Sequence, residues 1–144
     1  MFATKNDMVS RFGAKEVIQL TDREYSGAID DAVLQRGLTS ADAEISGYLA
    51  GRYALPFSVV PQMLIDYACD IARYRLTGTE VTCTQGIESR YDQAVKYLTL
   101  VGQGKISLGI DTAGAVVGSP AATGNSIRVQ RGGRRFNDDS MAGY

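Results

Sequence analysis

The sequence has 144 residues, 44% hydrophobic and 22% charged, and its 15 Lys and Arg residues nearly balance its 16 Asp and Glu residues. This length fits one small domain, and the net charge of -1 argues against a strongly basic nucleic-acid binder. The chain contains no histidine, which excludes Ser-His-Asp and Cys-His catalytic arrangements and every zinc site with a His ligand. We therefore expect a protein that is not an enzyme and that needs no cofactor.

The cysteines and the N-terminal sequence indicate the compartment. Cys69 and Cys83 do not form a Cys-x-x-Cys pair, so we expect free thiols, with Cys69 in the core. The first residues have neither the basic start nor the apolar run of a signal peptide, and no segment approaches the roughly 20 apolar residues of a membrane helix. The sequence therefore predicts a soluble cytoplasmic product without membrane association.

The N-terminal part of the chain predicts a short helix followed by a long one. Thr4 can cap a short helix that Gly13 ends. Apolar residues at helical spacing then predict a helix near 29–53, and their phase continues across Gly37, although a break at this glycine is the alternative.

Small residues follow one side of this long helix: Ala43, Gly47, Ala50, Gly51 and Ala54. Because a glycine inside a helix costs about 1 kcal/mol relative to alanine, Gly47 and Gly51 indicate either a closely packed neighbouring backbone or ordinary tolerance.

Two further amphipathic helices are predicted near 60–77 and 86–102, which completes a mainly α bundle of about four helices. Asp66 and Asp70 lie one turn apart in the first of them, a spacing that an acid/base or divalent-metal site could use. No third acid or phosphate-binding loop accompanies them, so we favour ion pairs with Arg73 or Arg52.

The composition changes near Gly104. We expect a helical body over 1–104, a short extended or β segment near 105–110, and an extended C-terminal arm that completes the 105–144 region. The far end combines basic residues with apolar anchors: Arg128, Arg131, Arg134, Arg135, Phe136, Met141 and Tyr144. This pattern favours a segment that docks on another protein over a solvated tail.

Three sequence blocks carry a resemblance to a known family. They are ISGYLAGRYALPF at 45–57, DIARYRL at 70–76 and the closing RFNDDSMAGY at 135–144. In this order and spacing they resemble the Mu-type phage and prophage neck proteins, a branch of the helical head-tail connector (adaptor) proteins of long-tailed phages.

The resemblance implies a structural virion protein at the head-tail junction. Such proteins form a ring, with a dodecamer matching the portal symmetry, beneath the portal protein, and contact the downstream neck or tail-completion protein. Packaged DNA passes through the lumen without specific binding. We expect the arm to carry the portal or inter-subunit contact, and the body-motif residues to fix the body internally: Arg52, Tyr53, Pro56, Asp70, Arg73 and Tyr74.

Two alternatives remain open at this point. One is a stopper or tail-completion protein one layer lower in the neck. The other is a nucleic-acid-binding protein that uses the Arg-Gly-Gly-Arg-Arg run at 131–135, whose affinity would fall steeply with salt.

Overall fold

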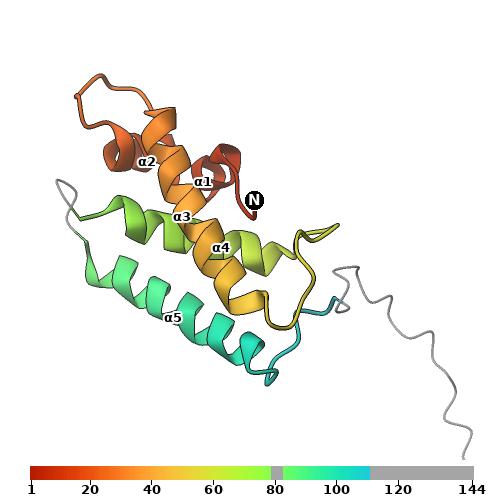
Figure 1. Ribbon diagram of the computed structural model, residues 1–144. Helices are drawn as coiled ribbons and strands as arrows, with labels where there is room; N and C mark the ends of the chain where they lie inside the picture. Colours follow the sequence, from red (N-terminus) through yellow and green to blue (C-terminus); the bar gives the residue numbers. More distant parts are fainter. Residues whose placement is uncertain (79–82, 111–144) are drawn as a thin grey trace, which may run out of the picture.

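The computed structural model describes residues 1–78 and 83–110 and shows a helical body (Figure 1). α3 packs on both α4 and α5, and α4 also packs along α5, so these three long helices enclose most of the core. α1 and α2 pack against each other and cover one end of α4 and α3. The helices in the described residues are α1 (Lys5–Phe12), α2 (Ala14–Thr21), α3 (Asp31–Leu49), α4 (Gln62–Leu76) and α5 (Gln85–Gly102).

Capping residues define the first helix as expected. The Thr4 hydroxyl accepts a hydrogen bond from the Asp7 backbone N–H, and the Asp7 carboxylate accepts one from the Thr4 N–H at 2.7 Å. This reciprocal pair satisfies two of the free N–H groups at the helix start. Gly13 ends α1 with φ 83, which confirms the predicted short helix.

α2 was not predicted, so the described residues contain five helices where about four were expected. It follows Gly13 directly, and its eight residues are too few to show a helical repeat in the sequence. Val17 and Leu20 are buried, so packing against the body stabilises this short helix.

α3 runs unbroken through Gly37, which confirms one helix and excludes the alternative break. A Cβ at Gly37 would lie 2.8 Å from Cγ and Cδ2 of Leu76, so the absence of a side chain lets α3 approach the end of α4 closely. Asp30 caps the helix by accepting hydrogen bonds from the Ala32 and Val33 N–H groups.

The predicted end of this helix, near residue 53, is wrong, because α3 ends at Leu49. Residues 50–53 form a turn in which the Arg52 and Tyr53 N–H groups both donate to the Leu49 carbonyl oxygen. The side chains of these two residues hold the segment after α5, and those tertiary contacts outweigh the local helical pattern.

Of the two alternatives left open for Gly47 and Gly51, ordinary tolerance fits, since no described atom lies within 4 Å of a Cβ built at either position. The close approach instead occurs at Gly102, where a Cβ would lie 2.8 Å from the carbonyl oxygen of Tyr48. α5 therefore crosses α3 at a glycine near its own end.

Residues 105–110 form no strand, so of the expected extended or β segment only the extended alternative remains, with an isolated β bridge at Ile110. The segment is irregular, and Ile110 is buried against the core. The rest of the predicted arm, with all seven of its predicted contact residues, lies outside the described residues. Across the described residues, no helix is both long and apolar enough to cross a membrane.

Candidate functional site

The body-motif residues of the sequence form two separate groups in the structure. Arg52, Tyr53 and Pro56 follow α3, whereas Asp70, Arg73 and Tyr74 lie on α4. Each group has its own contacts, and the structure does not bring the two groups together into one site.

Arg52 and Tyr53 hold the segment that follows α5. The Arg52 Nη1 donates to the carbonyl oxygens of Val101 at 2.9 Å and Ile106 at 3.0 Å. The Tyr53 hydroxyl accepts a hydrogen bond from the Leu108 N–H at 3.3 Å. These contacts satisfy carbonyl groups at the end of α5 and fix the start of the chain that leads to the C-terminal arm.

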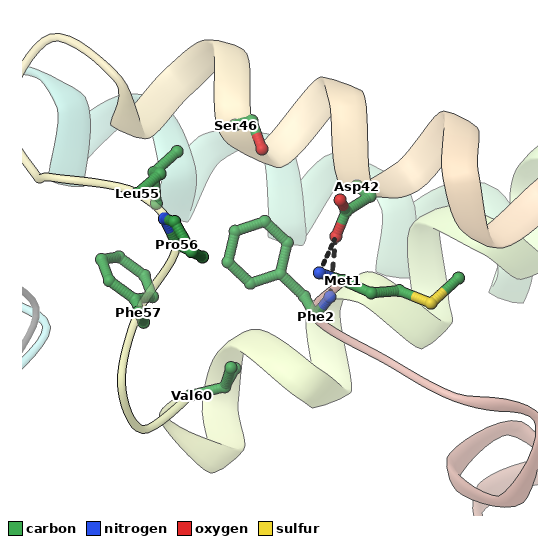
Figure 2. Close-up of a pocket in the computed structure, with 8 residues that line it drawn as sticks. All are labelled: Met1, Phe2, Asp42, Ser46, Leu55, Pro56, Phe57 and Val60. Atoms are coloured by element: carbon green, nitrogen blue, oxygen red, sulfur yellow. Dashed lines mark hydrogen bonds and ion pairs between the residues drawn. The ribbon is translucent and has the colours of Figure 1, made fainter.

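An apolar hollow of about 300 Å³ lies beside this turn (Figure 2). Figure 2 shows the Phe2 ring between α3, which carries Asp42 and Ser46, and the loop that carries Pro56 and Phe57. The Phe2 and Phe57 rings meet edge to face with centroids 5.9 Å apart.

The single carboxylate in this hollow is already paired. Asp42 accepts a hydrogen bond from the Phe2 N–H at 2.7 Å and lies 3.5 Å from the Met1 amino group. The hollow can therefore accept an apolar group, and its described lining presents no free acid or base. The lining residues are Met1, Phe2, Asp42, Ser46, Leu55, Pro56, Phe57 and Val60.

Arg11 on α1 joins the two carboxylates that the sequence singled out. Its Nη2 lies 2.8 Å from the Asp70 carboxylate and its Nη1 lies 3.0 Å from that of Asp66. The predicted pairing of these acids with Arg73 or Arg52 is wrong, because α1 packs on α4 and supplies the cation. Burial acts to lower the pKa of Arg11, but the hydrogen bond and charge of Asp70 outweigh it and raise the pKa above its ordinary value.

Asp70 is a packed structural group rather than an accessible acid. Its residue is 4% exposed, and Arg11 contacts both of its oxygens. Arg90 on α5 approaches the same carboxylate at 3.9 Å. This geometry joins α1, α4 and α5 through one buried carboxylate.

Arg73 contributes to packing at the other side of α1. Its guanidinium lies 4.7 Å from the centroid of the Phe12 ring and pairs with Glu16 on α2. A guanidinium over an aromatic face combines charge attraction with dispersion contacts. Arg73 therefore ties α1 and α2 to α4, as an internal body role requires.

Tyr74 stacks on Tyr91 with ring centroids 4.1 Å apart, which joins α4 to α5. The Tyr91 hydroxyl donates to Glu44 at 2.8 Å, and Glu44 also pairs with Arg75 at 2.8 Å. Burial, followed by the hydrogen bond to Glu44 and its charge, raises the pKa of Tyr91 to about 12. The hydroxyl is therefore a fixed donor near neutral pH.

No group of His, Cys, Asp and Glu residues within the described ranges has the arrangement of a metal site. Cys69 is buried and Cys83 exposed, and both are free thiols, which confirms the expected state of the cysteines. Burial raises the pKa of Cys69 to about 12, so its thiol stays protonated at neutral pH.

The comparison with protein families identifies the lineage of the chain. The model of the family described as "Bacteriophage Mu, Gp36" matches residues 2–126. The chain belongs to this family. It is 31% identical over 144 residues to the "Mu-like prophage FluMu protein gp36" of Haemophilus influenzae, covering all of this chain and 98% of that protein. It is also 35% identical over 112 residues to "Gene product J" of Escherichia phage Mu, which covers 77% of this chain and 78% of the relative.

In this Mu Gp36 family member, sequence reasoning missed the side chains that complete the contacts of α4. Arg11, Glu16 and Glu44 pair with α4 residues from other helices. Ladder spacing within α4 could reveal the two aspartates but not their partner, since Arg11 is distant in sequence. The sequence signal that could have pointed to Arg11 is the predicted helix end at Gly13, because it places Arg11 in the last turn of α1.

Proposed function

We propose that this chain is a head-tail connector, or adaptor, of Mu-type phages, a structural protein without a catalytic step. In this proposal copies form a ring under the portal protein, a dodecamer where the portal has that symmetry. The ring contacts the next neck or tail-completion protein, and the packaged DNA passes through its lumen. The site of action is the virion neck.

The observation that carries the proposal is the full-length relation to a Mu-like prophage protein, in a chain whose described residues form a braced helical body. Its conspicuous charged residues are used for packing: Arg11 joins α1 to α4, and Arg52 holds the end of α5. A body of this kind suits a subunit that must keep its shape under load between two assemblies.

The test is a Mu-type phage or prophage in which the gene for this chain is interrupted. We expect lysates with DNA-filled heads and free tails that are not joined, and we expect the purified chain to restore joined particles. Electron microscopy of the lysate with and without added protein gives both results. Complete infectious virions without the chain, or heads that contain no DNA, would contradict the connector role.

The arm is proposed to carry the contact with the portal or with a neighbouring subunit, especially through Arg134, Arg135, Phe136 and Met141. The Arg135→Ala, Phe136→Ala double variant should lose loading onto DNA-filled heads. A matched double variant, Asn137→Ala with Ser140→Ala, should load normally. Equal loading of both double variants would mean that the arm is not the anchor.

A further inference from the structure

Three arginines from different elements line one shallow hollow of about 180 Å³ on the body. Arg23 lies between α2 and α3, Arg36 lies on α3 and Arg75 lies on α4. All three are exposed, and the small residues Gly37 and Ser40 also line the hollow. The wall is completed by Val33 and Leu76, so we call this surface the arginine hollow.

The arginine hollow carries uncompensated positive charge. Among the described residues, Arg75 pairs with Glu44, whereas Arg36 has only a hydrogen bond to the Ala32 carbonyl oxygen. Arg23 has no ion pair or hydrogen bond in the same ranges. Within the described ranges the Arg23 and Arg36 guanidinium groups therefore have no carboxylate partner, and a guanidinium group suits planar oxygen anions.

The face of α5 that points away from the core carries two carboxylates and one cation, Lys96. Glu88 and Asp92 lie one helical turn apart on it and are both exposed. Within residues 1–78 and 83–110 neither carboxylate has an ion-pair partner. A shallow groove of about 300 Å³ runs along this face, lined by Gln85, Glu88, Ser89, Asp92, Gln93 and Lys96, and we call it the α5 groove.

We propose that the arginine hollow of one copy binds the Glu88 and Asp92 carboxylates in the α5 groove of a second copy. The two surfaces have complementary charge and lie on different elements of the same rigid body. Joining one face to a different face leaves each pair with a free hollow and a free groove, so assembly continues into a ring or a chain.

This contact would join neighbouring subunits of the proposed connector ring through identified side chains. Its biological role therefore rests on the proposed function. Exposed ion pairs contribute little individually and are screened by salt. The contact is therefore weak for two free copies and becomes effective when many copies are held together. A covalent trap is the suitable way to detect it.

The trap uses two proteins that each carry one exposed cysteine in a full-length Cys83→Ser background, Ser40→Cys in the arginine hollow and Ser89→Cys in the α5 groove, so that every charge of the contact is kept and Cys69 stays buried. Mixed and oxidised at low salt, they should give one covalent heterodimer, and peptide mass spectrometry should find residue 40 joined to residue 89. A single chain with both changes should give a ladder of covalent oligomers. The matched control pairs Ser40→Cys with Gln103→Cys, an exposed position at the other end of α5, and should not cross-link.

Charge reversal tests whether the charges specify the contact. Arg23→Glu added to the double-cysteine chain should remove the ladder, and Glu88→Arg in the same chain should restore it. No ladder from the unreversed chain, cross-linking of the Gln103→Cys control to the same extent, or no recovery on the second reversal would overturn the proposal.

Two outcomes separate this contact from other interpretations. In the first outcome the protein retains a DNA duplex in a salt-dependent way, Arg23→Glu abolishes that retention, and no ladder forms. The arginine hollow would then bind phosphate, and the proposal would be wrong. If the ladder forms and reverses as described but the protein fails to join heads to tails, the contact stands and the connector function fails.

Discussion

Arg11 illustrates how a single side chain organises the charges of this body. It joins the buried Asp70 and the more exposed Asp66 to α1, and its own side chain is 27% exposed. Loss of the Arg11 guanidinium would cost the two carboxylates different amounts of free energy. Asp70 would be left buried with only Arg90, 3.9 Å away, as a cation, whereas Asp66 would be solvated by water.

Replacing Arg11 with Met should therefore lower the free energy of unfolding by about 2 kcal/mol, because it leaves the buried Asp70 carboxylate with only the more distant Arg90, 3.9 Å away. Asp66→Asn, the matched control, should cost less than about 1 kcal/mol. Adding Asp70→Asn to Arg11→Met should recover part of the loss. Urea unfolding of the four proteins checks this, and equal effects of Arg11→Met and Asp66→Asn would show that Arg11 does not hold a buried charge.

The Cys69 thiol gives a prediction about alkaline pH. Its pKa rises from 9.0 to about 12 in the folded protein, so the folded state keeps a proton that the unfolded state releases. Because the folded state binds more protons over this range, the free energy of unfolding should fall as the pH rises above 9. Cys69→Ala should show a shallower fall when urea unfolding is measured at pH 8, 9 and 10. Parallel curves would contradict the shifted pKa.

At the scale of elements, close helix crossings depend on glycine in different ways. Gly102 sits against the backbone of Tyr48, whereas Gly37 sits against the end of the flexible Leu76 side chain. A backbone carbonyl cannot move without moving α3, so the crossing at Gly102 is the more rigid of the two. Gly86, in the first turn of the same helix α5, has no such contact.

Gly102→Ala should consequently destabilise the protein by about 1 kcal/mol or more, despite the better helix propensity of alanine, because the new Cβ displaces α5 from α3. Gly86→Ala should be neutral or stabilising, since Thr84 Oγ1 at 3.8 Å leaves room for a methyl group. Thermal unfolding followed by circular dichroism compares them. The same direction of change in both variants would mean that the crossing does not exclude a side chain.

Elements with local signals were predictable from the sequence, and those fixed by distant contacts were not. Thr4 and Gly13 mark the ends of α1 in the sequence itself, and continuous apolar spacing carries α3 through Gly37. The end of α3 at Leu49 depends on Arg52 reaching the carbonyl groups of Val101 and Ile106.

The candidate site divides in the same way. The sequence blocks identify the family and single out Asp70, Arg73 and Tyr74, which do brace the body. The arginine hollow escaped notice because Arg23, Arg36 and Arg75 are spread over three elements and have no common spacing. Charged residues that come together only in the folded structure form no motif that can be recognised in the sequence.

For the whole molecule, we propose that this member of the Mu Gp36 family attaches to DNA-filled heads through its C-terminal arm. The body and the arm have separate tasks in this account: the helices keep a fixed shape, and the arm residues, with Arg135 and Phe136 among them, carry the contact. Removing the arm should therefore leave a folded body that no longer attaches.

The most direct measurement is co-sedimentation of the purified full-length protein, and of a version ending at Ala113, with DNA-filled tailless heads. The full-length protein should bind in a fixed number of copies per head, and the shortened version should remain in the supernatant with its helical circular dichroism signal intact. If neither protein binds heads, and the full-length protein instead retains DNA in a salt-dependent way, the basic arm is a nucleic-acid-binding segment and the connector account is wrong.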